Sequence, residues 1–479
     1  MSLSKRNLAK QFLSSGSGKA GTVLFITILI ISILVVALYP LNFGVKVWNN
    51  PLHWADNPKA VPPAWTSTFS NNKEVEHQIF EAFAPDSVSG GVGTQEMIYT
   101  FDIDYDFDEF PTFLSLSVGR VDYYLDPPFV TLSIIRPDGQ EVRVYRDIVS
   151  GPRTDEIPPF SRYVESPLRV NLGGDDSVAS NVANFLRDDI GLDVSVMDVR
   201  GNTERALFGS FNDGTIDGAQ VLKGQYQARV RFVTYDDRDS VESIKFIVGG
   251  SVFGFMGTDS LGRDLAVGLL FGFPVALAIG LVTATIITTI GTFLGIVSGY
   301  YGGKVDTAIQ RTSDVLSNIP LLPILIFLIF ILGQKLWIVM VILIAFGWPG
   351  LTIIVRSMVL QIRSGQSVEA AKALGASQWR IMFRHIFPQI SPFIFAQLVF
   401  FTPAAILAEA ALSFLGLGDP SIPTWGQMLE HGFRTGGVYI GFWWWILPPG
   451  ILIVLTSMVF AFIALGLEPV VNPRLRRMD

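Results

Sequence analysis

The sequence predicts an α-helical integral membrane protein with six transmembrane helices and a mainly β extracytoplasmic domain. Two observations carry this prediction. The 479 residues are 49% hydrophobic and only 16% charged, whereas soluble domains are about a quarter charged. Residues 47–250 hold 17 Lys and Arg against 32 Asp and Glu, a net charge of −15, while the remainder holds 18 against 10. The chain therefore combines a basic, apolar body with an acidic insert.

Six stretches are long and apolar enough to cross about 30 Å of hydrocarbon as helices. They lie at residues 21–39, 267–298, 315–332, 337–355, 393–417 and 442–466. The first has basic residues before it, as a secretory signal would. Its apolar run of about 19 residues exceeds a signal core, and no small-residue cleavage pattern follows, so we expect a membrane anchor.

Lys and Arg predict the orientation. They collect in the segments that face the cytoplasm if the N-terminus lies inside, for example at Lys5, Lys304 and Arg363. We expect a multi-pass protein of the plasma or inner membrane, with both termini cytoplasmic and residues 47–250 outside. Residues 443–445, three tryptophans, would form an interfacial belt at the outer end of the last span. Basic runs placed between apolar stretches indicate contact with membrane lipid and not with nucleic acid.

The acidic insert shows the alternation of β-strands. Residues 130–136 and 141–147 flank Pro137-Asp138-Gly139 and predict a hairpin. Further strands are expected at 226–235 and 242–248, and one helix at 178–189. The chain has no cysteine, so this domain must be stable through its own core, for which roughly 200 residues suffice.

We expect three parts in chain order. Residues 1–46 would form a cytoplasmic N-terminus and the first span, 47–250 the acidic domain, and 251–479 a five-helix core. Prolines near residue 60 and Gly249-Gly250 would act as linkers. The core would carry a cytoplasmic loop at 360–390.

That loop has the pattern of a docking element. Residues 368–374 predict a short helix whose small Ala side chains let another protein approach its backbone, and Gly375 would end it. Trp379, Phe383 and Ile386 recur at helical spacing and predict a second helix along the membrane surface. Pro388 would end that helix and start the next span. A plain basic loop containing a helical hairpin is the alternative.

The same residues carry a resemblance. Glu369-Ala370-Ala371, then Gly375 after three residues, and Phe387-Pro388 at the end resemble the EAA loop of binding-protein-dependent ABC importers. Four further stretches resemble the dipeptide/oligopeptide/nickel permease family: GTDSLGRD (257–264), GYYGGKVD (299–306), LSFLGLGDPSIPTWGQML (412–429) and NPRLRR (472–477). The family usually has Leu at the position of Phe387, and its members have a much shorter loop in place of the insert.

The resemblance implies a fold and a function. The fold would be that of a type I ABC importer, and the chain a permease subunit that translocates peptides or similar small solutes. Its expected partners are a second permease subunit, two ABC ATPase subunits and an extracellular solute-binding protein. ATP and Mg would be bound by the ATPases, so this chain would be no enzyme and hold no cofactor. The residues implied in ATPase coupling are Glu369, Ala370, Ala371, Gly375 and Pro388.

Two further groups have more than one interpretation. One precedes the second span and would form a gate or cap on the outer side, or a helix start capped by Asp259 or Ser260. Its members are Gly257, Thr258, Asp259, Gly262, Arg263 and Asp264. The other is Glu409, in the fifth span, which would line the pathway, pair across a subunit interface or make a structural bond. Arg311 and Asp314 are spaced to pair on one helix.

Several sites are disfavoured by their patterns. Gly303-Lys304 lacks the spacing of a Walker A loop, so ATP chemistry must come from another polypeptide. Asp102, Asp104 and Asp106 start like an EF-hand, but Phe occupies its sixth and twelfth positions. A half-buried strand is favoured there, with a looser Ca²⁺ site left open, and the four His residues form no metal spacing.

Two other functional classes fit the sequence less well. A membrane receptor or scaffold that works through its outer domain needs only one anchor. An ion-coupled secondary transporter tends to show repeated halves with several charges inside the membrane. Six spans, the coupling loop and a single clear intramembrane carboxylate favour the ABC permease.

Overall fold

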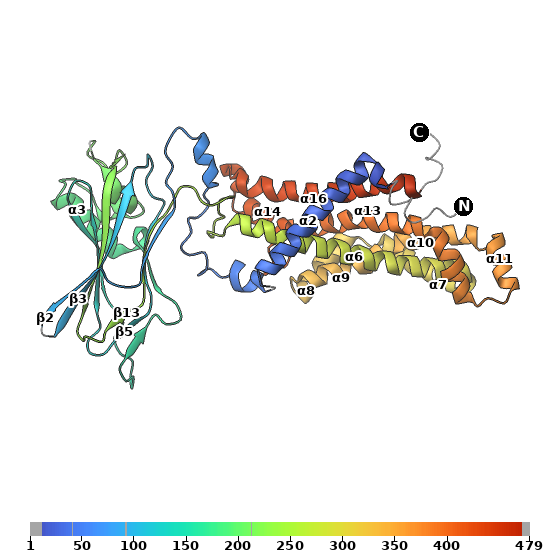
Figure 1. Cartoon of the computed structure of the whole chain (residues 1–479), viewed down its shortest axis with the longest axis horizontal. Helices are drawn as coiled ribbons and strands as arrows, with labels where there is room; N and C mark the ends of the chain where they lie inside the picture. The colour runs from blue at the N-terminus through green and yellow to red at the C-terminus, as the bar shows by residue number, and fades with distance from the viewer. Residues whose placement is uncertain (1–11, 41, 92, 212, 472–479) are drawn as a thin grey trace. The chain divides into compact units, whose positions relative to one another are not determined.

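The computed structural model describes residues 12–40, 42–91, 93–211 and 213–471 and separates into two compact units (Figure 1). The membrane unit contains the chain up to Asn50 and from Leu265 onward, and the strand-rich unit is Pro51–Asp264. The expected boundary at residue 250 lies inside the strand-rich unit. Residues beyond it are held there by backbone hydrogen bonds, such as Phe253 N to Pro62 O at 2.9 Å.

Five helices of the membrane unit are long and apolar enough to cross a bilayer among the described residues. They are α2 (Gly16–Leu38), α6 (Leu265–Tyr301), α9 (Leu336–Gly347) continued by α10 (Pro349–Ile362), α13 (Phe387–Phe414) with the turns before it, and α16 (Trp443–Val471). Short elements complete this unit: η1 (Gly44–Trp48), α14 (Trp425–Arg434) and α15 (Gly437–Ile440). The predicted helical membrane protein is confirmed.

The third predicted span differs from expectation. In place of one helix over 315–332, α7 (Gly303–Asn318) and α8 (Leu321–Leu332) meet at a bend of 84°. Pro320, at the break, has no backbone N–H and cannot continue the helix. The 12 residues of α8 rise only about 18 Å, too little to span the hydrocarbon alone. The pair therefore counts as a sixth span only if both halves are taken together.

Glycines set the distance between α6 and α10. Gly291, Gly295 and Gly299 lie one helical turn apart along α6. A Cβ at Gly295 or Gly299 would lie 2.6 or 2.7 Å from the Cβ of Val355 or Val359, closer than real side chains approach. Small residues at such spacing let membrane helices pack backbone to backbone, which is needed where the hydrophobic effect does not drive association.

The tryptophans at the start of α16 do not form the expected belt. Trp444 is 7% exposed and Trp445 is 1% exposed, and only Trp443, at 39%, offers its ring to the surroundings. Trp445 lies against Gly432 of α14. Two of the three rings are therefore buried inside the chain, and Trp445 holds α14 against α16.

The strand-rich unit contains two antiparallel sheets that share one core. The five-stranded sheet has the order β2 (Ser87–Gly91), β3 (Thr94–Tyr105), β12 (Gly224–Thr234), β6 (Phe129–Ile135) and β7 (Glu141–Ile148). The four-stranded sheet has the order β1 (Gln78–Ala82), β14 (Ile244–Val248), β4 (Leu114–Val118) and β9 (Leu168–Asn171). Ile103, Leu132, Leu116 and Phe246, from both sheets, are buried in the same cluster. The unit is therefore a sandwich (Figure 1).

Smaller elements complete the sandwich. They are β5 (Val121–Tyr123), β8 (Phe160–Arg162), β13 (Ser240–Val241), β10 (Gly209–Ser210), β11 (Gln220–Val221), α3 (Asp176–Asp188), α4 (Val196–Val199), α5 (Thr203–Phe208), η2 (Ala64–Phe69) and η3 (Leu172–Gly174). The predicted hairpin is confirmed as β6–β7, and the other predicted strands and helix as β12, β14 and α3. Asp175 caps α3 by accepting hydrogen bonds from the backbone of Ser177 and Val178.

The Asp-rich stretch is the half-buried strand β3. Phe101, Ile103 and Tyr105 are buried, and the intervening Asp side chains are exposed. Directly after the end of β3, Asp106 accepts a 2.9 Å hydrogen bond from Lys73, which lowers the pKa of the Asp106 carboxyl. Lys223 pairs with Asp106 and Asp108 in the same way. These carboxylates neutralise nearby ammonium groups and do not converge on a common point that would suit Ca²⁺.

Candidate coupling segment

The segment between α10 and α13 is anchored by a buried face. Its first helix, α11 (Gln366–Ala373), places Val368 at 0% and Ala371 at 6% exposure, in a cluster with Val359 and Ile386. Ala371 therefore packs inside its own chain and cannot itself seat another protein, contrary to expectation. The opposite face exposes Glu369, Ala370 and Leu374, the last at 88%.

Gly375 ends α11 with left-handed geometry, as predicted. Its φ is +76°, its N–H donates to Lys372 O at 2.9 Å, and the N–H of Ala376 donates to Ala371 O at 3.0 Å. This pair of bonds is a Schellman motif, which satisfies the last helical carbonyls and favours glycine. A Cβ at Gly375 would meet nothing within 4 Å. The backbone conformation, and no packing against the described residues, requires glycine here.

The expected separate surface helix is absent from the described chain, because α12 (Gln378–Ile381) runs into α13 through one π-helical turn, Met382–Ile386 (η4). Phe387 N–H donates to Met382 O, five residues back. The wider turn accommodates Pro388, which has no N–H and whose ring would clash with the carbonyl four residues before it. α12, η4 and α13 thus form one continuous helix.

An ion pair ties the first turn of α7 to α10, and a hydrogen bond ties the same carboxylate to α6. Arg356 Nε donates to Asp306 Oδ1 and Arg356 Nη2 donates to Asp306 Oδ2, both at 2.5 Å. Ser298 Oγ donates to the same Oδ1, also at 2.5 Å. Gly302 and Gly303, with φ of +66° and +56°, make the turn that brings Asp306 back to α6. This is a bidentate, charge-assisted contact, the strong kind.

Two weaker contacts join the same turn to the coupling segment. Arg363 Nη1 donates to Gly299 O at 3.1 Å, and Lys372 Nζ lies 5.7 Å from the ring centre of Tyr300. The sequence interpretation missed this joint, although Asp306 belongs to the GYYGGKVD stretch and Arg356 follows a predicted span directly. It named Arg311 and Asp314 instead, which are 3.9 Å apart and largely exposed, so their pairing contributes little.

The Gly257–Asp264 motif is locked within the strand-rich unit. Asp259 and Arg263 are buried and form an ion pair at 2.5 Å, and Asp259 Oδ1 also accepts from the backbone of Leu261. Thr258 N donates to Val61 O and Ala60 N donates to Asp259 O. The opposed charges satisfy each other and close a turn. Asp259 therefore caps this turn and not the start of α6.

Glu409 is packed inside its own chain. It is 5% exposed, accepts a 2.6 Å hydrogen bond from Ser413, and contacts the hydroxyl of Thr424, the N-cap of α14. Gly426 lies so close to α13 that a Cβ would be 2.6 Å from Ala410 O. The geometry favours the structural bond over a pathway lining, because the carboxylate joins α13 to α14.

Comparison with known proteins decides the family. The sequence matches the family described as binding-protein-dependent transport system inner membrane component over residues 291–477. It is also 38% identical over 224 residues to the dipeptide transport system permease protein DppC of Bacillus subtilis, covering 47% of this chain and 69% of that relative. The chain belongs to the permease subunits of binding-protein-dependent ABC importers.

Other relatives of the permease agree. It is 34% identical over 243 residues to the oligopeptide transport system permease protein OppC of Haemophilus influenzae, covering 50% of this chain and 76% of that relative. The glutathione transport system permease protein GsiD of Pectobacterium atrosepticum is 34% identical over 252 residues, covering 50% and 80%. A structure of the MetNI methionine ABC transporter in inward-facing conformations aligns with 43% of the permease and 96% of that chain, at 20% identity and a TM-score of 0.36.

Family membership confirms the predicted resemblance and decides against a receptor or an ion-coupled secondary transporter. Permeases of this family work with ATPases in separate subunits. The NPRLRR stretch, at 472–477, and the basic residues before Gln11 lie outside the described residues. The coupling, gate and pathway residues stay predictions, refined above by what each side chain contacts.

Proposed function

We propose that this permease is one of two membrane subunits of an ATP-driven importer of peptides or similar small solutes. The peptide substrate is supported by the relatives, which are named as dipeptide, oligopeptide and glutathione permeases. Two ATPase subunits would bind ATP and Mg, and a solute-binding protein would deliver the substrate. In this topology both termini face the cytoplasm and Pro51–Asp264 lies outside.

The observation that carries the coupling role is the two-sided character of α11. Val368 is fully buried against α10 and α13, while Leu374, six residues later, is 88% exposed. An exposed leucine beside Glu369 and Gly375 offers an apolar contact on a rigidly anchored support. An ATPase cleft seated there would move α11 and, through η4, rotate α13 between inward-open and outward-open states.

Reconstitution tests this proposal. The permease would be co-expressed with two ATPase subunits and a second permease subunit and placed in liposomes. The liposomes would then be supplied with binding protein and labelled dipeptide. We expect uptake that requires both ATP and the binding protein. Uptake of dipeptide driven by an ion gradient without ATP, or no co-purification of Walker-A-bearing subunits, would contradict it.

The strand-rich unit fits a docking role for the binding protein. Its net charge of −15 over residues 47–250 favours a partner with a basic face and repels acidic ones. Electrostatic docking of this kind acts mainly on the association rate and weakens with salt. Raising the ionic strength should therefore slow the association of this unit with its binding protein, and an association rate independent of salt would argue against electrostatic docking.

A further inference from the structure

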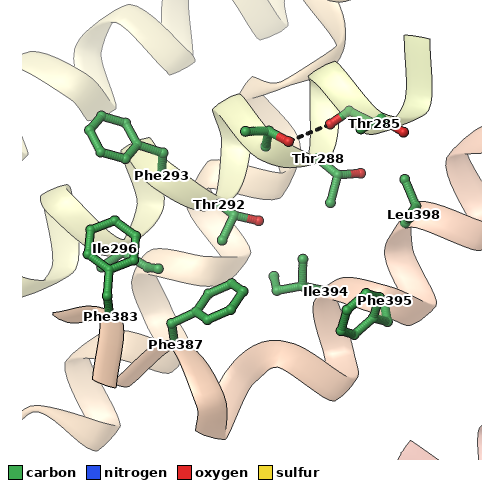
Figure 2. A pocket seen from close by; sticks show the side chains of 11 residues that line it. Thr285, Thr288, Thr292, Phe293, Ile296, Phe383, Phe387, Ile394, Phe395 and Leu398 are labelled. Atoms are coloured by element: carbon green, nitrogen blue, oxygen red, sulfur yellow. Dashed lines mark hydrogen bonds between the residues drawn. The ribbon is translucent and has the colours of Figure 1, made fainter. Parts of the chain in front are cut away.

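A cavity of about 290 Å³ lies in the membrane unit, between α6 and the junction of η4 with α13 (Figure 2). Eleven residues line it, and none carries a charge: Thr285, Thr288, Thr289, Thr292, Phe293, Ile296, Phe383, Phe387, Ile394, Phe395 and Leu398. Its volume is at the lower end of the range for small-molecule sites. Neither the coupling argument nor the motifs account for it.

The α6 wall of the cavity carries buried hydroxyls without partners. Thr288 and Thr292 are 5% and 6% exposed, and neither Oγ1 has a hydrogen-bond partner among the described residues. Thr289, on the same wall, does bond to its own helix, donating to Thr285 O at 2.7 Å. Figure 2 shows the side chains of Thr288 and Thr292 on the face of α6 that looks toward Ile394 and Leu398. Buried polar groups normally find partners, so these two call for one.

The opposite wall is aromatic and includes residues of the coupling segment. Phe383 belongs to η4 and Phe387 begins α13. The ring of Phe383 stacks on Trp379 at 5.7 Å, and Trp379 stacks on Phe293 of α6 at 6.3 Å. The cavity and the coupling segment therefore share a wall. Any shift of α12 changes the space between the phenyl rings and the threonines.

These features select the chemistry of the occupant. A lipid chain would fill the space but leave both hydroxyls unpaired, which is unfavourable in an apolar medium. A charged group would find no counter-charge on any wall. An uncharged stretch of peptide meets both demands, because its amide N–H and C=O groups can bond the hydroxyls while an apolar side chain packs on the phenyl rings.

We propose that this cavity is a substrate-contact site on the translocation path. It holds a peptide bond between Thr288 and Thr292 and an apolar side chain against Phe383 and Phe387. The inference rests on the proposed function and deepens it by naming residues that contact the substrate. Closure of the aromatic wall by the coupling segment would expel the peptide in step with ATP turnover.

Thr→Val substitutions test the hydroxyls without changing side-chain volume much. We expect the double variant Thr288→Val/Thr292→Val, in the full reconstituted transporter, to import an alanine tripeptide roughly three- to tenfold more slowly, the value of one or two hydrogen bonds. Thr283→Val is the matched control, because Thr283 lies on the same helix, is 0% exposed and has an unpartnered hydroxyl, but does not line the cavity. Equal loss in the control, or no loss in the double variant, overturns the site.

A modified substrate, combined with the double variant, distinguishes direct contact with the peptide from a structural role of the two hydroxyls. Methylating the amide nitrogen of the tripeptide's central residue removes one hydrogen-bond donor from the substrate. We expect this methylation to slow import by the wild type more than import by the double variant, after correction for affinity to the binding protein. An identical slowing in both means that the hydroxyls do not contact the peptide.

Cysteine labelling asks directly what fills the cavity. The chain has no cysteine, so Thr288→Cys or Thr292→Cys introduces a unique thiol. We expect a small methanethiosulfonate to modify it, and the tripeptide to protect it during turnover, while the exposed Thr312→Cys on α7 is modified with or without peptide. A thiol that stays unmodified without peptide indicates that a partner subunit fills the space. If the wild type imports peptide but peptide gives no protection, only this inference fails, whereas absent import by the wild type refutes the proposed function.

Discussion

The two units of this permease differ in how they use charge. In the strand-rich unit, charged residues are abundant and many pairs are exposed, such as Lys73 with Asp106, at 56% and 65% side-chain exposure, although Asp259 and Arg263 form a buried pair. In the membrane unit, charges are few, and the least exposed ion pair of its described residues, Asp306 with Arg356 at 16% and 29%, lies at a joint between helices. Exposed pairs contribute about 0–1 kcal/mol each, and desolvated ones cost far more to break. Substitutions at joints between the membrane helices should therefore matter more than substitutions in exposed pairs.

The largest effect is expected where α6 and α10 touch backbone to backbone. Gly295→Leu places a side chain where even a Cβ would lie 2.6 Å from Val355, so the helices must separate or the chain must misfold. Overpacking of this kind costs about 1–3 kcal/mol or more. Yield of folded protein in detergent, measured by size-exclusion chromatography, should collapse.

Gly350→Leu is the control for that substitution. It lies in α10, and a Cβ there meets nothing within 4 Å. This variant should be recovered like the wild type. Similar losses from both substitutions would show that leucine in these helices is harmful irrespective of close packing.

The Asp306–Arg356 joint should give the next largest effect. Arg356→Lys keeps the charge but loses the planar, two-point contact, so we expect a folded permease whose ATPases hydrolyse ATP with several-fold less substrate imported per ATP. The measurement is the ratio of dipeptide imported to ATP consumed in liposomes.

Arg311→Ala serves as the matched control for this joint, because Arg311 is 80% exposed and its nearest carboxylate is 3.9 Å away. Its import-to-ATP ratio should equal that of the wild type. An unchanged ratio in Arg356→Lys would mean that the joint only holds the fold.

Two substitutions of Gly375 distinguish its need for left-handed backbone geometry from the need for an unobstructed ATPase contact. Gly375→Val opposes the left-handed φ of +76° and should cost about 1–2 kcal/mol in the turn, with import uncoupled from ATP hydrolysis. Gly375→Asn tolerates this conformation better but still adds a side chain. If Asn restores import in the liposome assay, the backbone is what matters, and if both variants are uncoupled to the same degree, the added side chain blocks the ATPase.

The smallest effect concerns pH and the strand-rich unit. Burial lowers the pKa of His77 from 6.5 to about 4, against the attraction of Asp56 and a backbone bond at Val248, which raise it. The unfolded chain therefore takes up a proton near pH 6.5, before the folded chain does. Stability should fall as the pH drops from about 6.5 to about 4 and then level off. We expect the melting temperature of this unit to fall by several degrees across that window.

His77→Gln isolates this contribution, since the carboxylates titrate in both proteins. Hydrogen exchange of β1 and β14, corrected for intrinsic rates at each pH, reports the opening of the strand-rich unit within the full chain. The wild type should lose more protection than the variant between pH 6.5 and 4. Parallel curves would show that His77 is already protonated in the folded state or is hydrated there.

Much of both units could be predicted from local patterns. Long apolar runs, the end of α11 at Gly375 and the alternation in β3 each depend on a few neighbouring residues, so periodicity and glycine suffice. The bend between α7 and α8 was missed because the predicted span at 315–332 joined the last residues of the polar α7 to the apolar α8, and hydropathy does not register the proline between them. The separate surface helix was wrong because a π-turn absorbs Pro388 without ending the helix.

By itself the sequence determined the membrane class, the acidic and mainly β insert and the family resemblance, because composition, period and motif spacing are properties of the chain in order. Only the tertiary structure decided which side chains meet across distance. Ala371 faces inward, Arg356 reaches Asp306, and Thr288 and Thr292 face the phenyl rings of another helix. Such contacts depend on how helices rotate and cross in packing, and residues far apart in the chain carry no local signal of it.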